Sequence, residues 1–147
     1  MSATLAVLLT LSPLHAKNIR LEKCPPAVQA TIEQNLYGRE IEKIKEIKIN
    51  DYSLYLVEVH VKGFRDATFY ISGDGTLRKI VEEIRFKDLP AAVQESVLTY
   101  VSRKGKVDDV ERVLIRGEVL YQVEIEPPKG PDQILVFEPD GSISSEK

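Results

Sequence analysis

Two stretches of the chain, Tyr55–Lys62 and Tyr121–Ile125, alternate between core-type and outward-type positions with a period of two. This period is typical of a β-strand that has one face in a hydrophobic core. Both stretches begin Tyr-x-Val-Glu, and the two tyrosines lie 66 positions apart. The pattern therefore predicts two equivalent strands within a longer repeat.

The flanking sequence repeats as well. At the same spacing, residues 41–77 match residues 107–143 without a gap, and Asp74-Gly75 coincides with Asp140-Gly141. Upstream the spacing falls to 65, and one additional residue near Gly105 accounts for the difference. Loops tolerate such insertions best. An internal duplication is the strongest inference from the sequence alone.

The duplication predicts two domains, repeat 1 at residues 17–83 and repeat 2 at residues 84–147. Each begins with a helix that follows a proline, whose missing N–H costs nothing there. Each helix has apolar residues at four-residue spacing and ends near a glycine suited to a left-handed cap. The apolar stripes are Val28, Ile32 and Leu36 in repeat 1 and Val93, Val97 and Val101 in repeat 2, followed by Gly38 and Gly105.

Strands are predicted after each helix. The first centres on Ile47 and Ile49 (Val113 and Ile115 in repeat 2), and the wider spacing back to Ile44 and Ile41 indicates a β-bulge. Turns at 50–53 and 116–118 lead into the tyrosine strands, and third strands cover 67–72 and 133–138. The Asp-Gly pairs are hairpin turns, and a fourth strand, Leu77 to Phe86, ends repeat 1.

These elements define an α+β fold, a tandem duplication of a helix-plus-antiparallel-sheet unit in the order α-β-β-β-β. A unit of about 65 residues buries too little surface to be comfortably stable alone. We therefore expect the two sheets to be continuous or packed together.

The first residues have a different character. Residues 5–14 are mostly apolar, and Ala16 precedes the first charged residue, Lys17. This arrangement is typical of a secretory signal peptide, which we place at residues 1–16, and the run is too short to span a bilayer. The alternative is a buried N-terminal helix or strand. We favour export to the periplasm or the exterior, and we expect no membrane insertion after cleavage.

The charge composition argues against some classes of binding partner. The net charge is −3, and the basic residues are interspersed with acidic ones, so no basic stripe forms. Nucleic acids and anionic membrane surfaces are therefore unexpected partners.

Few residues suggest chemistry. Glu58 and His60 lie two apart on one predicted strand and can contribute to a metal or acid–base site, although a solvated strand face explains them more simply. Cys24 is the sole cysteine and aligns with Leu89 of repeat 2, which favours a small buried hydrophobe over a nucleophile. We expect neither an enzyme nor a bound cofactor.

The repeat resembles a known family. Pro-x-Ala-Val-Gln on a helix (Pro25 to Gln29, Pro90 to Gln94), a Tyr-x-Val-Glu strand and a third strand closed by Asp-Gly are similar to PepSY-like exported bacterial proteins. That group is itself similar to the β-lactamase-inhibitor-protein (BLIP) fold. The resemblance implies tandem helix-on-sheet units outside the cytoplasm and a binding or inhibitory role, and it supplies no functional residue.

One face of the predicted sheet is the candidate partner surface. If Tyr55, Val57 and Phe69 face the helices, the opposite parity carries apolar residues away from them, and exposed residues of this kind mark partner surfaces. The residues are Leu54, Leu56, His60, Tyr70, Leu120, Ile134 and Val136. The alternative, equally weighted, is that the other repeat or the N-terminal segment covers this face.

The sequence thus predicts a non-catalytic exported binding module for a protein partner, with inhibition of a protease or other hydrolase as one form. The alternative is an envelope enzyme or metal-binding factor that uses Glu58 and His60. A structural role in the cell envelope is a third reading.

Overall fold

The computed structural model describes residues 15–60, 66–101 and 105–144, and these form two α-helices and eight strands. Short 3₁₀ turns at Leu21–Lys23 and Phe86–Asp88 precede the helices. The helices are α1 (Pro26–Asn35) and α2 (Ala91–Val101). The strands are β1 (His15–Asn18), β2 (Glu40–Ile49), β3 (Tyr52–His60), β4 (Ala67–Ser72), β5 (Leu77–Glu83), β6 (Lys106–Ile115), β7 (Glu118–Glu126) and β8 (Gln133–Phe137).

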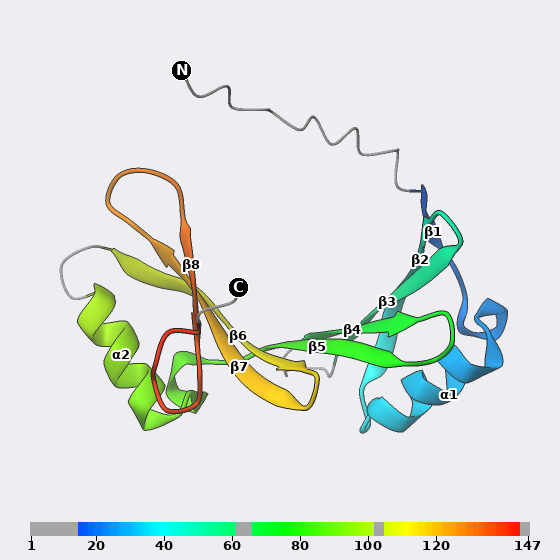
Figure 1. Cartoon of the computed structure of the whole chain (residues 1–147), viewed down its shortest axis with the longest axis horizontal. Helices are drawn as coiled ribbons and strands as arrows, with labels where there is room; N and C mark the ends of the chain where they lie inside the picture. The colour runs from blue at the N-terminus through cyan, green and yellow to red at the C-terminus, as the bar shows by residue number, and fades with distance from the viewer. Residues whose placement is uncertain (1–14, 61–65, 102–104, 145–147) are drawn as a thin grey trace, which may run out of the picture.

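The strands make one antiparallel sheet in which spatial order follows chain order, β1 to β8. The middle of the sheet is the pairing of β5 with β6, where Lys79–Glu83 lie opposite Glu111–Ile115. Figure 1 shows both helices below the sheet, one near each end, while the two ends of the sheet rise on the other side. The predicted α+β architecture of helices on an antiparallel sheet is therefore observed.

Each helix buries one apolar stripe. Val28 and Ile32 of α1 are fully buried, as are Val93 and Val97 of α2. The chain leaves α1 through a left-handed turn in which Tyr37 has a φ of 46° and Gly38 a φ of 79°. The predicted stripes and the predicted glycine at the end of the first helix are confirmed.

Two separate cores result. Around α1, ten buried residues cluster, among them Tyr55 and Val57 of β3 and Phe69 of β4. Around α2, seven buried residues cluster, among them Val123 and Phe137. No residue belongs to both clusters. The strand parity predicted for Tyr55, Val57 and Phe69 is confirmed, because they pack with the helix.

In each half of the chain, one side-chain hydrogen bond, here called the helix–hairpin tie, joins the helix to the Asp-Gly hairpin turn. The Thr31 hydroxyl donates to the Gly75 carbonyl oxygen, and the Ser96 hydroxyl donates to the Gly141 carbonyl oxygen at 2.7 Å. Both glycines have positive φ, 87° and 88°. A Cβ at Gly75 would lie 2.7 Å from the Ala27 carbonyl oxygen, so the turn needs glycine for space as well as for conformation.

Strands β2 and β6, the first strand after each helix, contain the predicted β-bulges. Their register shifts lie between Ile41 and Lys43 and between Val107 and Val110. Other boundaries differ from the prediction. β5 ends at Glu83 because Arg85 and Asp88 close a 3₁₀ turn through a side-chain ion pair at 2.8 Å. The turn into β3 is shorter than predicted, since Tyr52 already pairs with Ile49.

The sequence did not predict β1, which pairs with β2 and includes the last two residues of the expected leader. The rest of that leader, residues 1–14, lies outside the described residues. Among the helices described, none has the length and hydrophobicity required to cross a bilayer.

Candidate functional site

The strand register places all seven predicted partner residues on the face of the sheet opposite the helices, here called the helix-free face. Residues directly opposite on neighbouring strands share a face. Leu56 lies opposite Tyr70, which lies opposite Lys79. Leu54, Glu58 and His60 share this parity on β3, and pairing carries it across β5 and β6 to Leu120, Val136 and Ile134.

The exposure of these residues is uneven. Ile134 is 59% exposed, whereas Leu54, Leu56, His60, Tyr70 and Val136 are half-buried. Leu120 corrects the expectation, because only 9% of it is exposed. It lies opposite Val113, which is itself 7% exposed and opposite Val81. A row of aliphatic side chains at the middle of the sheet shields Leu120, so it is not available to a partner.

Charge divides the helix-free face into two halves. The first-unit half is the part of this face formed by β2 to β5. There, Lys45 Nζ lies 3.3 Å from a Glu58 carboxylate oxygen, and Lys79 Nζ lies 5.1 Å from the centre of the Tyr70 ring. The second contact is within the range of a cation–π interaction. This half therefore combines an aromatic ring and aliphatic side chains with lysines.

The second-unit half, the part of this face formed by β6 to β8, is acidic. Single carboxylate oxygens of Asp108, Glu124 and Asp132 lie within 4.8 Å of one another. Burial raises the pKa of Glu124, and so do the hydrogen bond that its protonated form donates to Asp132 and the nearby negative charges. Burial also raises the pKa of Glu111, with Asp109 adding to the effect. The direction of these shifts reflects the clustering of carboxylates in this half of the face, because like charges held together destabilise their ionised forms.

Glu58 and His60, the pair proposed for metal or acid–base chemistry, are not drawn into a common site. Glu58 is engaged by Lys45, as described above. His60 Nδ1 lies 3.9 Å from Glu42 Oε2, which is too long for a hydrogen bond. Among the described residues, the group with metal-ligand spacing contains neither Glu58 nor His60.

Cys24 lies in the first core with only 4% of it exposed, and Leu89 has the same exposure in the second core. Its thiol points at the Arg20 carbonyl oxygen, 3.6 Å away. Burial, reinforced by the negative charge of Glu46, raises the pKa of the thiol. The prediction of a buried hydrophobe at this position is confirmed.

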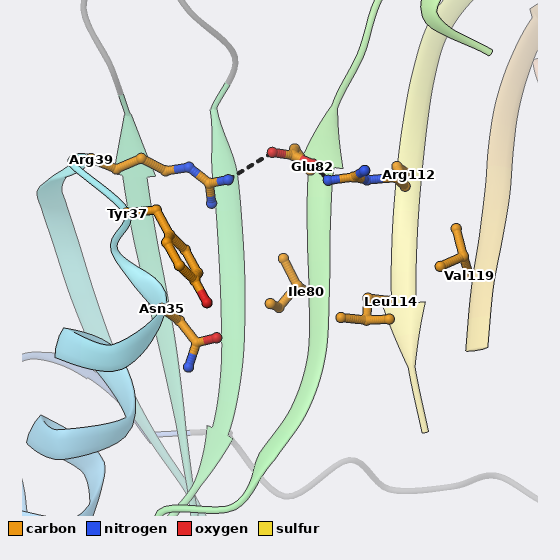
Figure 2. A pocket seen from close by; sticks show the side chains of 8 residues that line it. All are labelled: Asn35, Tyr37, Arg39, Ile80, Glu82, Arg112, Leu114 and Val119. Atoms are coloured by element: carbon orange, nitrogen blue, oxygen red, sulfur yellow. Dashed lines mark hydrogen bonds and ion pairs between the residues drawn. The ribbon is translucent and has the colours of Figure 1, made fainter. Parts of the chain in front are cut away.

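A pocket that the sequence did not reveal lies on the opposite side of the sheet, between the end of α1 and the β6–β7 hairpin. Its volume is about 350 Å³. Figure 2 shows Asn35 and Tyr37 on one side, Leu114 and Val119 on the other, and Ile80 between them. We call this the interhelix pocket; it is also lined by Arg39, Glu82 and Arg112.

A row of three charged side chains closes one end of the interhelix pocket. Arg39 Nη2 lies 2.7 Å from Glu82 Oε1, and Arg112 contacts the other oxygen of the same carboxylate. The Arg39 and Glu82 side chains are only 18% and 13% exposed, whereas Arg112 is 51% exposed. Two guanidinium groups against one carboxylate leave a surplus positive charge at this end.

The pocket could have been suspected from one sequence signal only. Glu82 lies two positions after Ile80 on the same strand, so the two side chains lie on the same face of the sheet. This spacing indicates an acidic residue on the helix side of the sheet. The two arginines lie 43 and 30 positions away from Glu82 in the chain, and no local pattern brings them together.

Comparison with solved structures identifies the fold. A BLIP-like protein from Bacteroides fragilis superposes with a TM-score of 0.67 at 20% identity, covering 84% of this chain and 85% of its own. A candidate periplasmic protein from Bacteroides eggerthii gives 0.66 at 18% identity, with coverages of 82% and 85%. A DUF2874 family protein from Bacteroides uniformis gives 0.66 at 19% identity, with coverages of 82% and 86%.

The fold is thus of the BLIP-like kind, as the sequence resemblance implied. No protein-family profile matches the chain. No curated protein matches it in sequence.

Proposed function

We propose that this chain is a non-catalytic binding module exported to the periplasm or beyond, and that it docks a protein partner on the helix-free face. The observation that carries the proposal is the aromatic and aliphatic group at Leu56 and Tyr70, half-buried on a face of the sheet that neither α1 nor α2 covers. Tyrosine on a rigid strand gives large contact area at little entropic cost.

The comparisons with solved structures support the proposal of an exported binding module. One similar structure is a BLIP-like protein, and another is described as a candidate for the periplasm. Inhibition of a protease or other hydrolase is the finer form of the proposal.

The division of charge specifies the partner further. A partner that lies across the face would set an acidic or neutral apolar surface against the Lys45 and Lys79 half. It would set basic groups against the half around Glu111 and Glu124. Complementary charge of this kind increases the association rate and selects the partner more than it adds affinity.

Tandem duplication explains why the face is broad. The matching ties from Thr31 to Gly75 and from Ser96 to Gly141, and the matching bulges in β2 and β6, support an origin from one helix-on-sheet unit. Joining β5 to β6 makes one surface from two units. A standard interface buries roughly 800 Å² per partner, and a surface made from two units offers more room for one than a single unit does.

Catalysis has no part in the proposal because the candidate groups are held in unreactive states. Glu58 is paired with Lys45, and the Cys24 thiol is buried with a raised pKa. A nucleophilic thiolate needs a lowered pKa and access to substrate.

The test is affinity capture from envelope extract with the chain beginning at Lys17 as bait, compared with the Tyr70→Asp/Val136→Asp double variant. We expect the wild type to retain a specific protein and the double variant to lose it by at least tenfold, because buried charge at an interface centre is strongly unfavourable. The hydrolytic activity of the captured protein, with and without the chain, then tests inhibition.

Leu98→Asp is the matched control, since Leu98 is 57% exposed on α2. It should retain the captured protein fully. Retention by a folded Tyr70→Asp/Val136→Asp variant would exclude the helix-free face as the docking surface. Circular dichroism of both variants establishes that they are folded.

A further inference from the structure

We propose that the interhelix pocket binds a small organic monocarboxylate with a short apolar tail, with the carboxylate on Arg112 and the tail over Ile80, Leu114 and Val119. The pocket lies on the helix side of the sheet, so this inference is independent of partner docking on the helix-free face.

The apolar floor is the first argument. Ile80 packs at the edge of the first core, but Leu114 and Val119 belong to neither core cluster of the described residues. The strand register sets the three in one row, Ile80 opposite Leu114 and Leu114 opposite Val119. Leu114 is 38% exposed. Three aliphatic side chains therefore line the pocket, and two of them, Leu114 and Val119, are used by neither core.

The surplus charge is the second argument. Glu82 is the sole acidic group of the pocket lining and faces two guanidinium groups. A guanidinium has five N–H donors in a planar fork that matches a carboxylate. Arg112, half exposed, contacts Glu82 through one Nη and retains donors for a ligand. One surplus positive charge suits a monoanion, whereas a dianionic phosphate would bring a second negative charge beside Glu82.

The rim is the third argument. Tyr37 is 83% exposed at the pocket edge and is held there by backbone in the left-handed region, with a φ of 46°. Non-glycine residues in this region are uncommon and cluster at binding sites. In Figure 2 the Tyr37 ring stands beside the pocket between Asn35 and Arg39. A large apolar ring in this position can cover the tail of a bound ligand.

The size of the ligand follows from the space. A volume of about 350 Å³ is at the lower end of small-molecule pockets, which favours a ligand well below drug size. Each additional buried CH₂ group should tighten binding about fourfold, until the chain outgrows the floor.

The experiment is a two-dimensional amide NMR titration of the whole chain with sodium octanoate, with octan-1-ol and acetate as matched probes. We expect octanoate to shift the amides of Tyr37, Arg39, Arg112 and Leu114, and to bind at least tenfold more tightly than either probe. Octanol lacks the charge and acetate lacks the tail.

Two variants change the charge in opposite directions. Arg112→Gln should weaken octanoate binding about tenfold or more, because a charge-assisted contact is lost. Glu82→Gln should tighten it severalfold by releasing both guanidinium groups. Arg85→Gln, at an exposed arginine paired with Asp88 outside the pocket, is the matched control and should bind as the wild type does.

The proposal is overturned if octanol binds as well as octanoate, if Arg112→Gln binds unchanged, or if the shifted amides lie on the helix-free face. Leu114→Glu covers the case in which an arginine variant unfolds. It places a carboxylate on the apolar floor of the pocket, and a folded Leu114→Glu variant that still binds octanoate would equally exclude the site.

Discussion

The two halves of the molecule share the same helix–hairpin ties but pack different cores. In both, a helical hydroxyl reaches a hairpin glycine, and a glutamine side chain, Gln29 or Gln94, donates to the carbonyl oxygen that precedes the helix at 2.8 Å. The core around α1 nevertheless contains ten buried residues and the core around α2 seven. Local hydrogen bonding is therefore matched between the halves while packing is not.

The difference extends to polar groups near the cores. Tyr55 is buried and its hydroxyl donates to Glu46 at 3.1 Å, whereas the matching Tyr121 is half-buried and makes no hydrogen bond among the residues described. A buried hydroxyl must be paired, whereas a wetter one can bond to solvent. At this position the first half is thus the more completely buried of the two.

The largest effect is expected from deleting one aromatic ring in each core. Phe69 and Phe137 are 0% and 1% exposed, so Phe69→Ala and Phe137→Ala should each cost about 3–5 kcal/mol. Because the cores share no residue, Phe137→Ala should accelerate amide hydrogen exchange in α2 while α1 stays protected. Equal acceleration in both helices would show that the halves open as one unit.

A smaller effect is expected at the hairpin glycines. Gly75→Ala should cost about 2–3 kcal/mol, since a positive φ and a close approach to the Ala27 carbonyl oxygen both oppose a Cβ. Gly117→Ala is the matched control, with a φ of 76° but open space around it, and should cost about 1 kcal/mol. Denaturant melts compare the two; equal costs would mean that the helix yields to the new methyl group.

The smallest effect separates the two tyrosines. Burial, with the hydrogen bond to Glu46, raises the pKa of Tyr55 to about 12. Its folded state therefore keeps the proton longer than the unfolded state. The resulting stability is fully present below pH 10 and is lost as the pH rises toward 12.

In an ultraviolet titration of the six tyrosines, one should ionise late, and Tyr55→Phe should remove that late step. Tyr55→Phe should cost about 1 kcal/mol at neutral pH and Tyr121→Phe less. A late step that persists in Tyr55→Phe would assign it to another ring.

Much of the fold could be predicted because it depends on local patterns. Period-two alternation gave the parity of Tyr55, Val57 and Phe69, and irregular isoleucine spacing gave the bulge near Ile41. The strand β1 escaped prediction because its residues are all exposed and it pairs along a single edge, which leaves no hydrophobic period to detect.

The surfaces were harder to predict than the elements. Parity put Leu120 on the helix-free face, but its burial depends on Val113 and on the pairing of β5 with β6, a long-range contact. The interhelix pocket likewise depends on Arg39 and Arg112 meeting Glu82 from opposite sides. Such side-chain contacts depend on the tertiary structure, and no local spacing in the sequence indicates them.

The order of strands in the sheet has a consequence for how the chain folds. Because β1 to β8 are neighbours in space in the order of the chain, each strand pairs only with the strands that directly precede and follow it in the chain. Only the pairings of β1 with β2 and of β5 with β6 enclose a helix, so these two closures carry the largest loop entropy. Low contact order of this kind favours rapid folding, and the growing sheet can extend one strand at a time from either half.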